Sequence, residues 1–408
     1  MKLWIDAGRT SAGRDGAEHV FGMDLIERHL KAARHQKLEL SEVIIDVGDG
    51  AAPVWASEPR LGCPVRVESG SGNCGDRLRR ALAAGEVLLV SDAATLADAR
   101  LYRYLADRTG SAAVRANKAA IGRVEPADAE KILSAPTLDA AIGHLAEVSQ
   151  DEFPSFVVKL RRALPFYLFS VTNPAERKSV ERFLFWSNYK GSTDFFTKYV
   201  YPPLVWAMVP PLARARVHPN TVTLVSIVLT VLAVPLFATG YFWWGFACAY
   251  GMSVLDSVDG KLARLTFTDS AIGNVLDHGL DIVHPPFWYF GWAIGLLGGW
   301  AVTDFNQPLW QAAWIMMALY VLDRLILAVY RAKYKRGLHT HAPMDAVVRT
   351  FISRRNINLP LFTVAYAAGW GVEAFYVVVL WQALTCTYHG LRTIWILGTY
   401  RPAAKRHP

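Results

Sequence analysis

Residues 256–264 read Asp-Ser-Val-Asp-Gly-Lys-Leu-Ala-Arg, and residues 273–281 read Gly-Asn-Val-Leu-Asp-His-Gly-Leu-Asp. These two acidic stretches lie between apolar regions. The 39 residues of Val217–Leu255 contain no Asp, Glu, Lys or Arg, and neither does Ile282–Thr303. One membrane-spanning helix needs about 20 residues at 1.5 Å rise per residue, so the first run is long enough for two helices. The acidic stretches are therefore expected at adjoining ends of two consecutive membrane helices.

Further charge-free runs predict an all-α membrane domain of six transmembrane helices. The expected spans are 219–239, 242–265, 273–298, 308–331, 347–369 and 373–396. Basic residues gather before the first span, between the fourth and fifth and in the C-terminal tail, whereas the short connections near 240, at 298–307 and at 370–372 contain no Lys or Arg. By the positive-inside rule, both termini and the acidic stretches face the cytoplasm. We expect a multi-pass protein of an inner or cytoplasmic-type membrane.

The N-terminal part has a different composition. Residues 1–190 contain 26 Lys+Arg and 25 Asp+Glu, whereas the remaining 218 residues contain 17 and 10. The first part thus has the charge content of a soluble domain, and the basic excess lies in the apolar part, which argues against a nucleic-acid binder. No signal peptide or cysteine metal site is indicated. The predicted division is a soluble cytoplasmic domain, a linker with an interfacial amphipathic segment, a membrane domain and a basic tail, at residues 1–185, 186–217, 218–400 and 401–408.

Carboxylates at membrane depth cost a few kcal/mol each and are functional by default. The acidic stretches supply four of them, at Asp256, Asp259, Asp277 and Asp281. Each pair is three or four residues apart and so shares one helix face. Lys261 and Arg264 nearby leave an excess of two negative charges, which a divalent cation would balance, and carboxylate oxygens suit Mg²⁺ or Mn²⁺. Salt bridges, or carboxylates facing cytoplasmic water, are the alternative interpretations.

The residues between the acids favour a phosphorylated ligand. Gly260 and Ala263 lie one helical turn apart and remove side-chain bulk, so a ligand can approach the backbone there. Arg264 offers a bidentate donor for a diphosphate.

The pattern Asp-x2-Asp-Gly-x2-Ala-Arg-x8-Gly-x3-Asp-x3-Asp resembles the signature of the CDP-alcohol phosphotransferases (CDP-alcohol phosphatidyltransferases) at every position. The stretch His218-Pro-Asn-Thr-Val-Thr223 is similar to the Pro-Asn-x-x-Thr start of that family's first span, and the resemblance covers about residues 190–400. It implies a six-helix, usually dimeric membrane fold that moves a phosphoalcohol group from a CDP-alcohol to an acceptor alcohol and releases CMP. It also implies two Mg²⁺ or Mn²⁺ ions on the four motif acids, with Asp281 additionally acting as general base toward the acceptor hydroxyl. The nucleotide-binding residues that it implies are Asn220, Gly260, Ala263, Arg264 and Gly273.

The acceptor site is less specific in sequence. Arg349, Arg354 and Arg355 lie together where the fifth span leaves the cytoplasm. They could clamp a phosphate on the acceptor, as an inositol phosphate or a glycerol phosphate would require, or they could be ordinary positive-inside anchors.

Residues 1–150 alternate strand and helix patterns, which predicts an α/β sandwich with a mostly parallel sheet. Strands are expected at 3–7, 42–47, 64–68, 86–91 and 112–115, and helices at 22–34, 76–84 and 96–108. The pattern resembles a sugar-nucleotide nucleotidyltransferase domain, including its closing strand and helix at 169–184. That family's glycine-rich loop survives only as a fragment at Asp6–Gly13, and a second carboxylate near Asp92 is not evident. We therefore expect a degenerate domain used for docking, dimerisation or regulation, with active cytidylyltransfer as the alternative.

The sequence thus predicts a membrane transferase of phospholipid or headgroup synthesis, with the lipid bilayer, a CDP-alcohol and an alcohol acceptor as partners. Two donors compete: CDP-diacylglycerol, or a soluble CDP-alcohol such as CDP-inositol in an inositol-phosphodiester synthase. Rivals of other classes are a divalent-cation transporter, since intramembrane acids also mark ion pathways, and a silent scaffold.

Overall fold

The structure is a computed structural model of the 408-residue chain. It describes residues 1–8, 19–48, 63–82, 85–269, 271–300, 304 and 306–399, without the side chains of 150, 159, 271, 272, 274–278, 280 and 281. The basic tail at 401–408 and most of the glycine-containing fragment after the first strand lie outside these residues.

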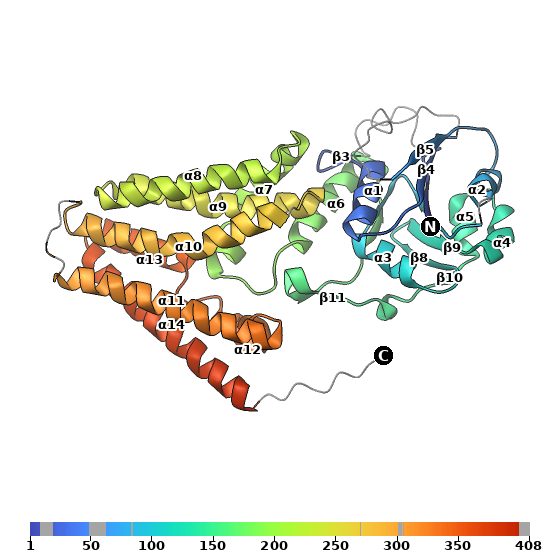
Figure 1. Cartoon of the computed structure of the whole chain (residues 1–408). Helices are drawn as coiled ribbons and strands as arrows, with labels where there is room; N and C mark the ends of the chain where they lie inside the picture. Colours follow the sequence, from blue (N-terminus) through green and yellow to red (C-terminus); the bar gives the residue numbers. More distant parts are fainter. Residues whose placement is uncertain are drawn as a thin grey trace.

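An N-terminal α/β part and a C-terminal helical part make up the chain (Figure 1). The strands of the α/β part are β1 (Lys2–Asp6), β2 (His19–Val20), β3 (Met23–Asp24), β4 (Glu42–Asp46), β5 (Val65–Glu68), β6 (Leu88–Asp92), β7 (Thr95–Ala97), β8 (Ala112–Ala116), β9 (Ala119–Val124), β10 (Ala146–Glu147), β11 (Phe156–Val157), β12 (Arg162–Ala163) and β13 (Leu168–Ser170). Its helices are α1 (Leu25–His35), α2 (Cys74–Leu82), α3 (Ala99–Asp107), α4 (Ala129–Leu133), α5 (Leu138–Gly143) and α6 (Pro174–Ser187).

Seven strands form one sheet in the order β10-β8-β9-β6-β1-β4-β5. Within this sheet, every described pairing is parallel except those of β9, which runs antiparallel to β6 and β8. Successive side chains of a strand point to opposite faces of the sheet. Leu3 and Ile5 accordingly pack in one core with residues of α1 and α3, whereas Trp4 packs in a second core with residues of α2 and α5. The predicted α/β sandwich with a mostly parallel sheet is confirmed.

The helical part follows α6 and a five-residue π-helical turn, η6 (Phe196–Val200). Its helices are α7 (Pro202–Arg214), α8 (Pro219–Ala238), α9 (Phe242–Thr266), α10 (Ala271–Leu296), α11 (Pro308–Tyr334), α12 (Pro343–Val348), α13 (Arg355–Ala367) and α14 (Gly371–Thr399). The chain turns between α8 and α9 at Gly240, whose φ of 82° suits glycine, as the charge-free run predicts. Among the described residues, α8 and α11 are long and apolar enough to cross a membrane, with mean hydropathies of 2.4 and 1.9.

The expected fifth span at 347–369 differs from the structure. The helix is interrupted: α12 ends at Val348, and α13 begins at Arg355 and has only 13 residues. The backbone of the interruption is bonded by α14 instead, because Ser353 N donates to Thr385 Oγ1 (2.9 Å) and Trp381 Nε1 donates to Phe351 O (2.9 Å). Side chains from a neighbouring helix thus take the place of helical hydrogen bonds, and the local sequence alone does not predict this.

The two parts of the chain are in direct contact. Arg214 Nη2 of α7 lies 3.0 Å from Glu181 Oε2 of α6, and that buried carboxylate also accepts from Phe21 N (2.8 Å). Phe267, in the connection between α9 and α10, packs against the α/β core, where the Arg28 guanidinium lies 5.0 Å from its ring centre. Because this connection joins the two acidic stretches, the α/β part lies directly beside the candidate site.

Candidate active site

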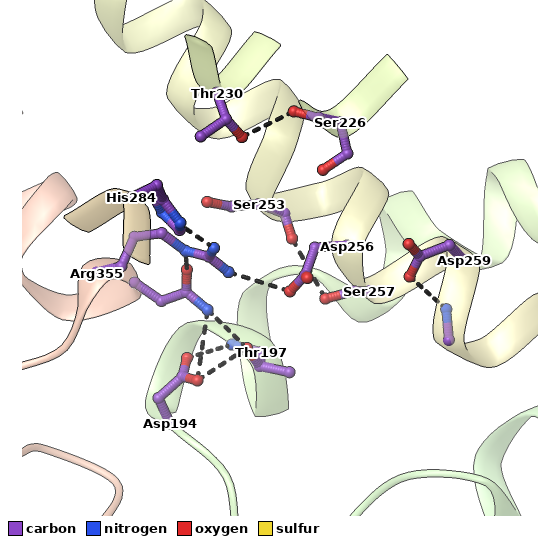
Figure 2. A network of polar contacts seen from close by, with 12 residues as sticks. Asp194, Thr197, Ser226, Thr230, Ser253, Asp256, Ser257, Asp259, His284 and Arg355 are labelled. Carbon is purple, nitrogen blue, oxygen red and sulfur yellow. Dashed lines mark hydrogen bonds and ion pairs between the residues drawn. The ribbon is translucent and has the colours of Figure 1, made fainter. Parts of the chain in front are cut away.

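Asp256 is the acid at the centre of the polar network in Figure 2. Its Oδ2 atom lies 3.0 Å from Arg355 Nη2, at the first turn of α13. The same guanidinium lies 3.4 Å from His284 Nε2 of α10 through Nη1. One arginine thus joins three helices, and it does so on a carboxylate that we expect to bind metal.

Asp259 has different surroundings, although it shares a face of α9 with Asp256. It is buried, and its Oδ2 accepts a 2.6 Å hydrogen bond from Thr223 Oγ1 of α8, while its Oδ1 accepts from Gly260 N. Thr223 is the threonine of the Pro-Asn-x-x-Thr stretch. The structure therefore connects two motifs that are 36 residues apart in sequence.

The second acidic stretch lies at the start of α10, which begins at Ala271. The side chains of Asp277 and Asp281 are outside the described residues, and so are those of the flanking Asn274 and His278. Within the described residues, no three His, Cys, Asp or Glu side chains form a group able to hold a metal ion. The four-acid metal site therefore stays a prediction. In its donor chemistry the set fits a hard divalent cation, because carboxylate oxygens are the ligands that Mg²⁺ and Mn²⁺ prefer.

Beside Asp256 lies a cavity of about 290 Å³. Among its described lining residues, nine are cationic and only two, Asp194 and Asp256, are acidic. The cationic side chains are Arg161, Lys190, Lys261, Arg264, Arg324, Arg331, Arg349, Arg354 and Arg355. This excess of positive charge makes the cavity suited to an anionic ligand.

The three arginines predicted for the acceptor all line this cavity, but they differ in their partners. Arg355 is paired with Asp256, as described above. Arg349 and Arg354 form no ion pair with a described carboxylate, and Arg349 Nε is buried without a hydrogen-bond partner. Burial of an unpaired guanidinium is costly unless an anion compensates it. The geometry is therefore better suited to ligand binding than to membrane anchoring.

Sequence reasoning missed the residues behind Arg355. Asn356 Oδ1 accepts from Arg355 Nε (3.1 Å), while Asn356 Nδ2 donates to Thr197 Oγ1 (3.0 Å) and to Asp194 Oδ2 (3.4 Å). Figure 2 shows these contacts passing from η6 to Arg355 and on to Asp256. Asp194 and Thr197 lie in the segment before α7, and no spacing in the sequence relates them to the motif acids.

The charge count in the sequence sets Lys261 against the motif acids, but its contacts in the structure are with other residues. It is buried, its Nζ donates to Phe185 O of α6 (3.1 Å), and it lies over the rings of Phe185 and Tyr189. Lys261 thus joins α9 to the α/β part through a carbonyl and two aromatic faces, although it also lines the cavity.

Only some of the residues predicted to hold the nucleotide line this cavity. Gly260 and Arg264 line it, whereas Ala263, Gly273 and Asn220 are not among its described lining residues. A side chain at Gly260 would place its Cβ 3.3 Å from Arg264 Nη1. Gly260 therefore leaves room for the Arg264 guanidinium as well as for a ligand.

Most of the helical part is similar to known proteins. Residues 216–389 match the family model described as CDP-alcohol phosphatidyltransferase. The chain is 34% identical over 118 residues to cholinephosphotransferase 1 of Xenopus laevis, covering 25% of this chain and 29% of that protein. It is 30% identical over 114 residues to phosphatidylinositol phosphate synthase of Mycobacteroides abscessus, covering 28% and 50%. The chain thus spans half or less of the length of these curated relatives.

Among solved structures, the phosphatidylinositol phosphate synthase of Mycobacterium tuberculosis with CDP-DAG bound resembles the chain with a TM-score of 0.38. The two are 19% identical, and the match covers 50% of this chain and 99% of that one.

Proposed function

Because residues 216–389 match the family model described as CDP-alcohol phosphatidyltransferase, we propose that the chain transfers a phosphoalcohol group from a CDP-alcohol to an acceptor alcohol and releases CMP. The family match favours an enzyme over the divalent-cation transporter and the silent scaffold. The position of Asp256 supports the same choice, because it lies beside a cavity whose described lining is cationic, whereas a cation pathway would be lined by acids.

The metal-binding residues of the proposal are the four motif acids, Asp256, Asp259, Asp277 and Asp281. When Mg²⁺ or Mn²⁺ is bound, it neutralises the charge that develops on the CMP leaving group. Thr223 orients the Asp259 carboxylate through its 2.6 Å hydrogen bond. In the same proposal, Asp281 takes the proton of the acceptor hydroxyl as attack on the donor phosphorus begins.

The nucleotide side of the site belongs to α9. Arg264 lines the cavity and is the proposed bidentate partner of the donor diphosphate. Gly260, one helical turn before it, leaves the space that this guanidinium occupies. The role that the family signature gives to Asn220, Ala263 and Gly273 remains a prediction.

The observation that carries the acceptor assignment is the excess of arginine in the cavity. Arg331, Arg349 and Arg354 line it without an ion pair to a described carboxylate. A phosphomonoester carries up to two negative charges and several acceptor oxygens, which match such a set. We propose that the acceptor alcohol carries a phosphate, as an inositol phosphate or a glycerol phosphate does.

A lipid bilayer around the helical part is supported by exposed apolar side chains. Leu224, Val231, Trp314, Leu325 and Leu380 are 58–61% exposed on α8, α11 and α14. Large exposed apolar faces of this kind indicate a membrane or a partner rather than water. We propose the six-span arrangement with α12 and α13 forming its interrupted fifth member, and a homodimer as its assembly.

Orientation is supported by the end of the helical part farthest from the α/β part (Figure 1). The turns at 239–241 and 368–370 contain no Lys or Arg. Exposed aromatic residues lie at these turns and in adjacent helical ends, at Tyr241, Trp243, Trp244 and Trp370. Interfacial aromatics and absent basic residues are typical of the non-cytoplasmic side. The motif acids, the α/β part and both termini are therefore proposed to be cytoplasmic.

For the α/β part we propose a degenerate nucleotidyltransferase-like domain within residues 1–185. Asp6 is the register partner of Asp92 on the neighbouring parallel strand, and Asp46 is the partner of Asp6 on the next strand, so a second carboxylate does lie beside Asp92. The Arg77 guanidinium lies 2.9 Å from both Asp6 and Asp46. Burial acts to lower the pKa of Arg77, but the two carboxylates outweigh it and raise the pKa above its usual value. An internal cation thus pairs with the carboxylates at the carboxyl ends of the parallel strands, the usual ligand edge of such sheets, which supports a docking or regulatory role.

The test is metal-dependent CMP release by the purified full-length protein in detergent. CDP-diacylglycerol and CDP-inositol are compared as donors, each with glycerol, glycerol 3-phosphate, inositol and inositol 1-phosphate. We expect CMP from one donor and only with a phosphorylated acceptor. Asp281→Asn should abolish turnover while metal and CDP binding largely survive on the three other motif acids, and Asp256→Asn should weaken metal binding itself. CMP release that is equally fast with unphosphorylated acceptors would refute the acceptor assignment.

A further inference from the structure

One of the cavity arginines comes from outside the helical part. Arg161 lies between β11 and β12, which pair as a short hairpin in the α/β part. Its backbone is left-handed, with φ 53° and ψ 39°, a conformation that residues other than glycine rarely adopt. Such a conformation persists only where surrounding contacts hold it, and it is often associated with a functional position.

The hairpin is held against the segment that leads into the helical part. Gly191 N donates to Leu160 O (2.8 Å), and Arg161 Nη1 donates to Ser192 O (3.3 Å). A Cβ at Gly191 would lie only 2.7 Å from Arg161 O, so the two backbones approach as closely as glycine allows. Ser192 Oγ in turn donates to His339 O, whose residue lines the cavity. Contacts of its backbone with Gly191 and of its guanidinium with Ser192 therefore hold Arg161 in place.

The charges around Arg161 are of the same sign. Burial, together with Arg354 and Arg331, lowers the pKa of its guanidinium from the usual value. Like Arg331, Arg349 and Arg354, it has no ion pair with a described carboxylate. Four guanidinium groups from separate elements therefore face one cavity, and their mutual repulsion is relieved when a multiply charged anion lies among them.

We propose that Arg161 is a substrate-specificity residue, supplied by the α/β part, that binds the phosphate of the acceptor together with Arg349 and Arg354. This inference rests on the proposed function and adds to it that the soluble part completes the acceptor pocket. Arg161 lies upstream of residues 216–389, the range of the family match, so the domain alone would lack this contact.

The test uses inorganic phosphate as the probe and the full-length protein in detergent without divalent cation. Calorimetric titration of wild type is compared with Arg161→Ala, Arg162→Ala and Gly191→Ala. Arg162 is the matched control, because it is the neighbouring arginine and is not among the described lining residues of the cavity. Gly191→Ala keeps every charge but displaces the Arg161 backbone.

We expect Arg161→Ala and Gly191→Ala to weaken phosphate binding by about tenfold or more, the loss typical of one charge-assisted hydrogen bond. Arg162→Ala should bind as wild type does. In turnover, Arg161→Ala should raise the KM for a phosphorylated acceptor and leave the KM for the CDP-alcohol unchanged. Arg161→Lys, which keeps a charge at this backbone position, should recover part of the binding.

The outcomes separate this inference from the proposed function. If wild type releases CMP but Arg161→Ala binds phosphate as Arg162→Ala does, the inference is wrong and the proposed function stands. If no CDP-alcohol yields CMP while phosphate binding depends on Arg161 and not on Arg162, the anion pocket is supported and the proposed function fails. Absence of phosphate binding in wild type would overturn the inference directly.

Discussion

Replacing Arg355 by glutamine should tighten the binding of Mn²⁺, whereas most changes near a metal site weaken it. Arg355 Nη2 lies 3.0 Å from Asp256 Oδ2, and the two side chains are 10% and 22% exposed. A metal ion that binds Asp256 must displace this guanidinium or share the carboxylate with it. Arg355→Gln removes the competing cation and leaves a shorter, neutral polar side chain.

The magnitude follows from the contact. At 3.0 Å and an effective dielectric constant of 20, the direct attraction is about 5.5 kcal/mol, most of which is offset by desolvation of the two groups. The net contribution of a hydrogen bond to a charged group is about 1.5–3 kcal/mol. Removing the competitor should therefore lower the Kd for Mn²⁺ by about tenfold to a hundredfold.

The assay is titration of Mn²⁺ into purified full-length protein, with free Mn²⁺ followed by electron paramagnetic resonance. Arg354→Gln is the matched control, because it removes an equal charge from the same cavity but no contact with Asp256. The two variants share the long-range effect of a lost charge, and their difference isolates the direct contact. An unchanged or higher Kd in Arg355→Gln relative to Arg354→Gln would show that the guanidinium and the metal do not compete for Asp256.

Three further predictions concern single contacts. Thr223→Val should weaken Mn²⁺ binding by about tenfold, because it removes the donor that orients a motif acid, while the exposed control Thr221→Val should not; equal affinities would refute this. Arg77→Met should lower the free energy of unfolding by about 3–5 kcal/mol in a urea titration, since two buried carboxylates lose their cation, whereas Arg79→Met at an exposed pair should change it by less than about 1 kcal/mol. Burial lowers the pKa of His29 to about 4 from its usual 6.5, so the unfolded state binds a proton first and stability should fall by up to about 3 kcal/mol as pH decreases from 6.5 to 4. His29→Gln should flatten that dependence, and an equally steep loss in the variant would assign it to other groups.

The α/β part was predictable where one pattern dominates. The strands at Leu3, Val43 and Leu89 are nearly continuous apolar runs, as strands covered by helices on both faces are, and their positions agree with the structure to within two residues. The helix predicted at 96–108 is too long at its start, because Thr95–Ala97 is strand β7 and the helix begins only after the Asp98 cap. Strand β7 pairs with β13, which follows more than 70 residues later in sequence, and no local pattern can predict a pairing over that separation.

The candidate site was predictable only along the motif. Spacing places Asp256 and Asp259 on one face of a helix, and the structure agrees. Spacing could not assign Arg355 to Asp256, because they lie 99 residues apart. Spacing could not indicate Asp194 either, because the only sequence feature of this residue is that it is an acid in an otherwise apolar and basic segment. Side chains that act across elements depend on packing, and packing is not local.

The contacts between the two parts argue against treating the α/β part as a removable extension. Lys261, within the motif on α9, donates to Phe185 O of α6, and removal of residues 1–190 would leave this buried side chain without that acceptor and without either aromatic face. The same truncation would remove Arg161 from the cationic cavity beside Asp256 and the α1 side chains that contact Phe267. The loss at Lys261 falls on the motif itself, that at Phe267 falls on the connection between its two acidic stretches, and that of Arg161 falls on the cavity beside Asp256. A membrane domain expressed alone should therefore fold less stably and bind phosphate more weakly than the full chain, even though it contains all four motif acids.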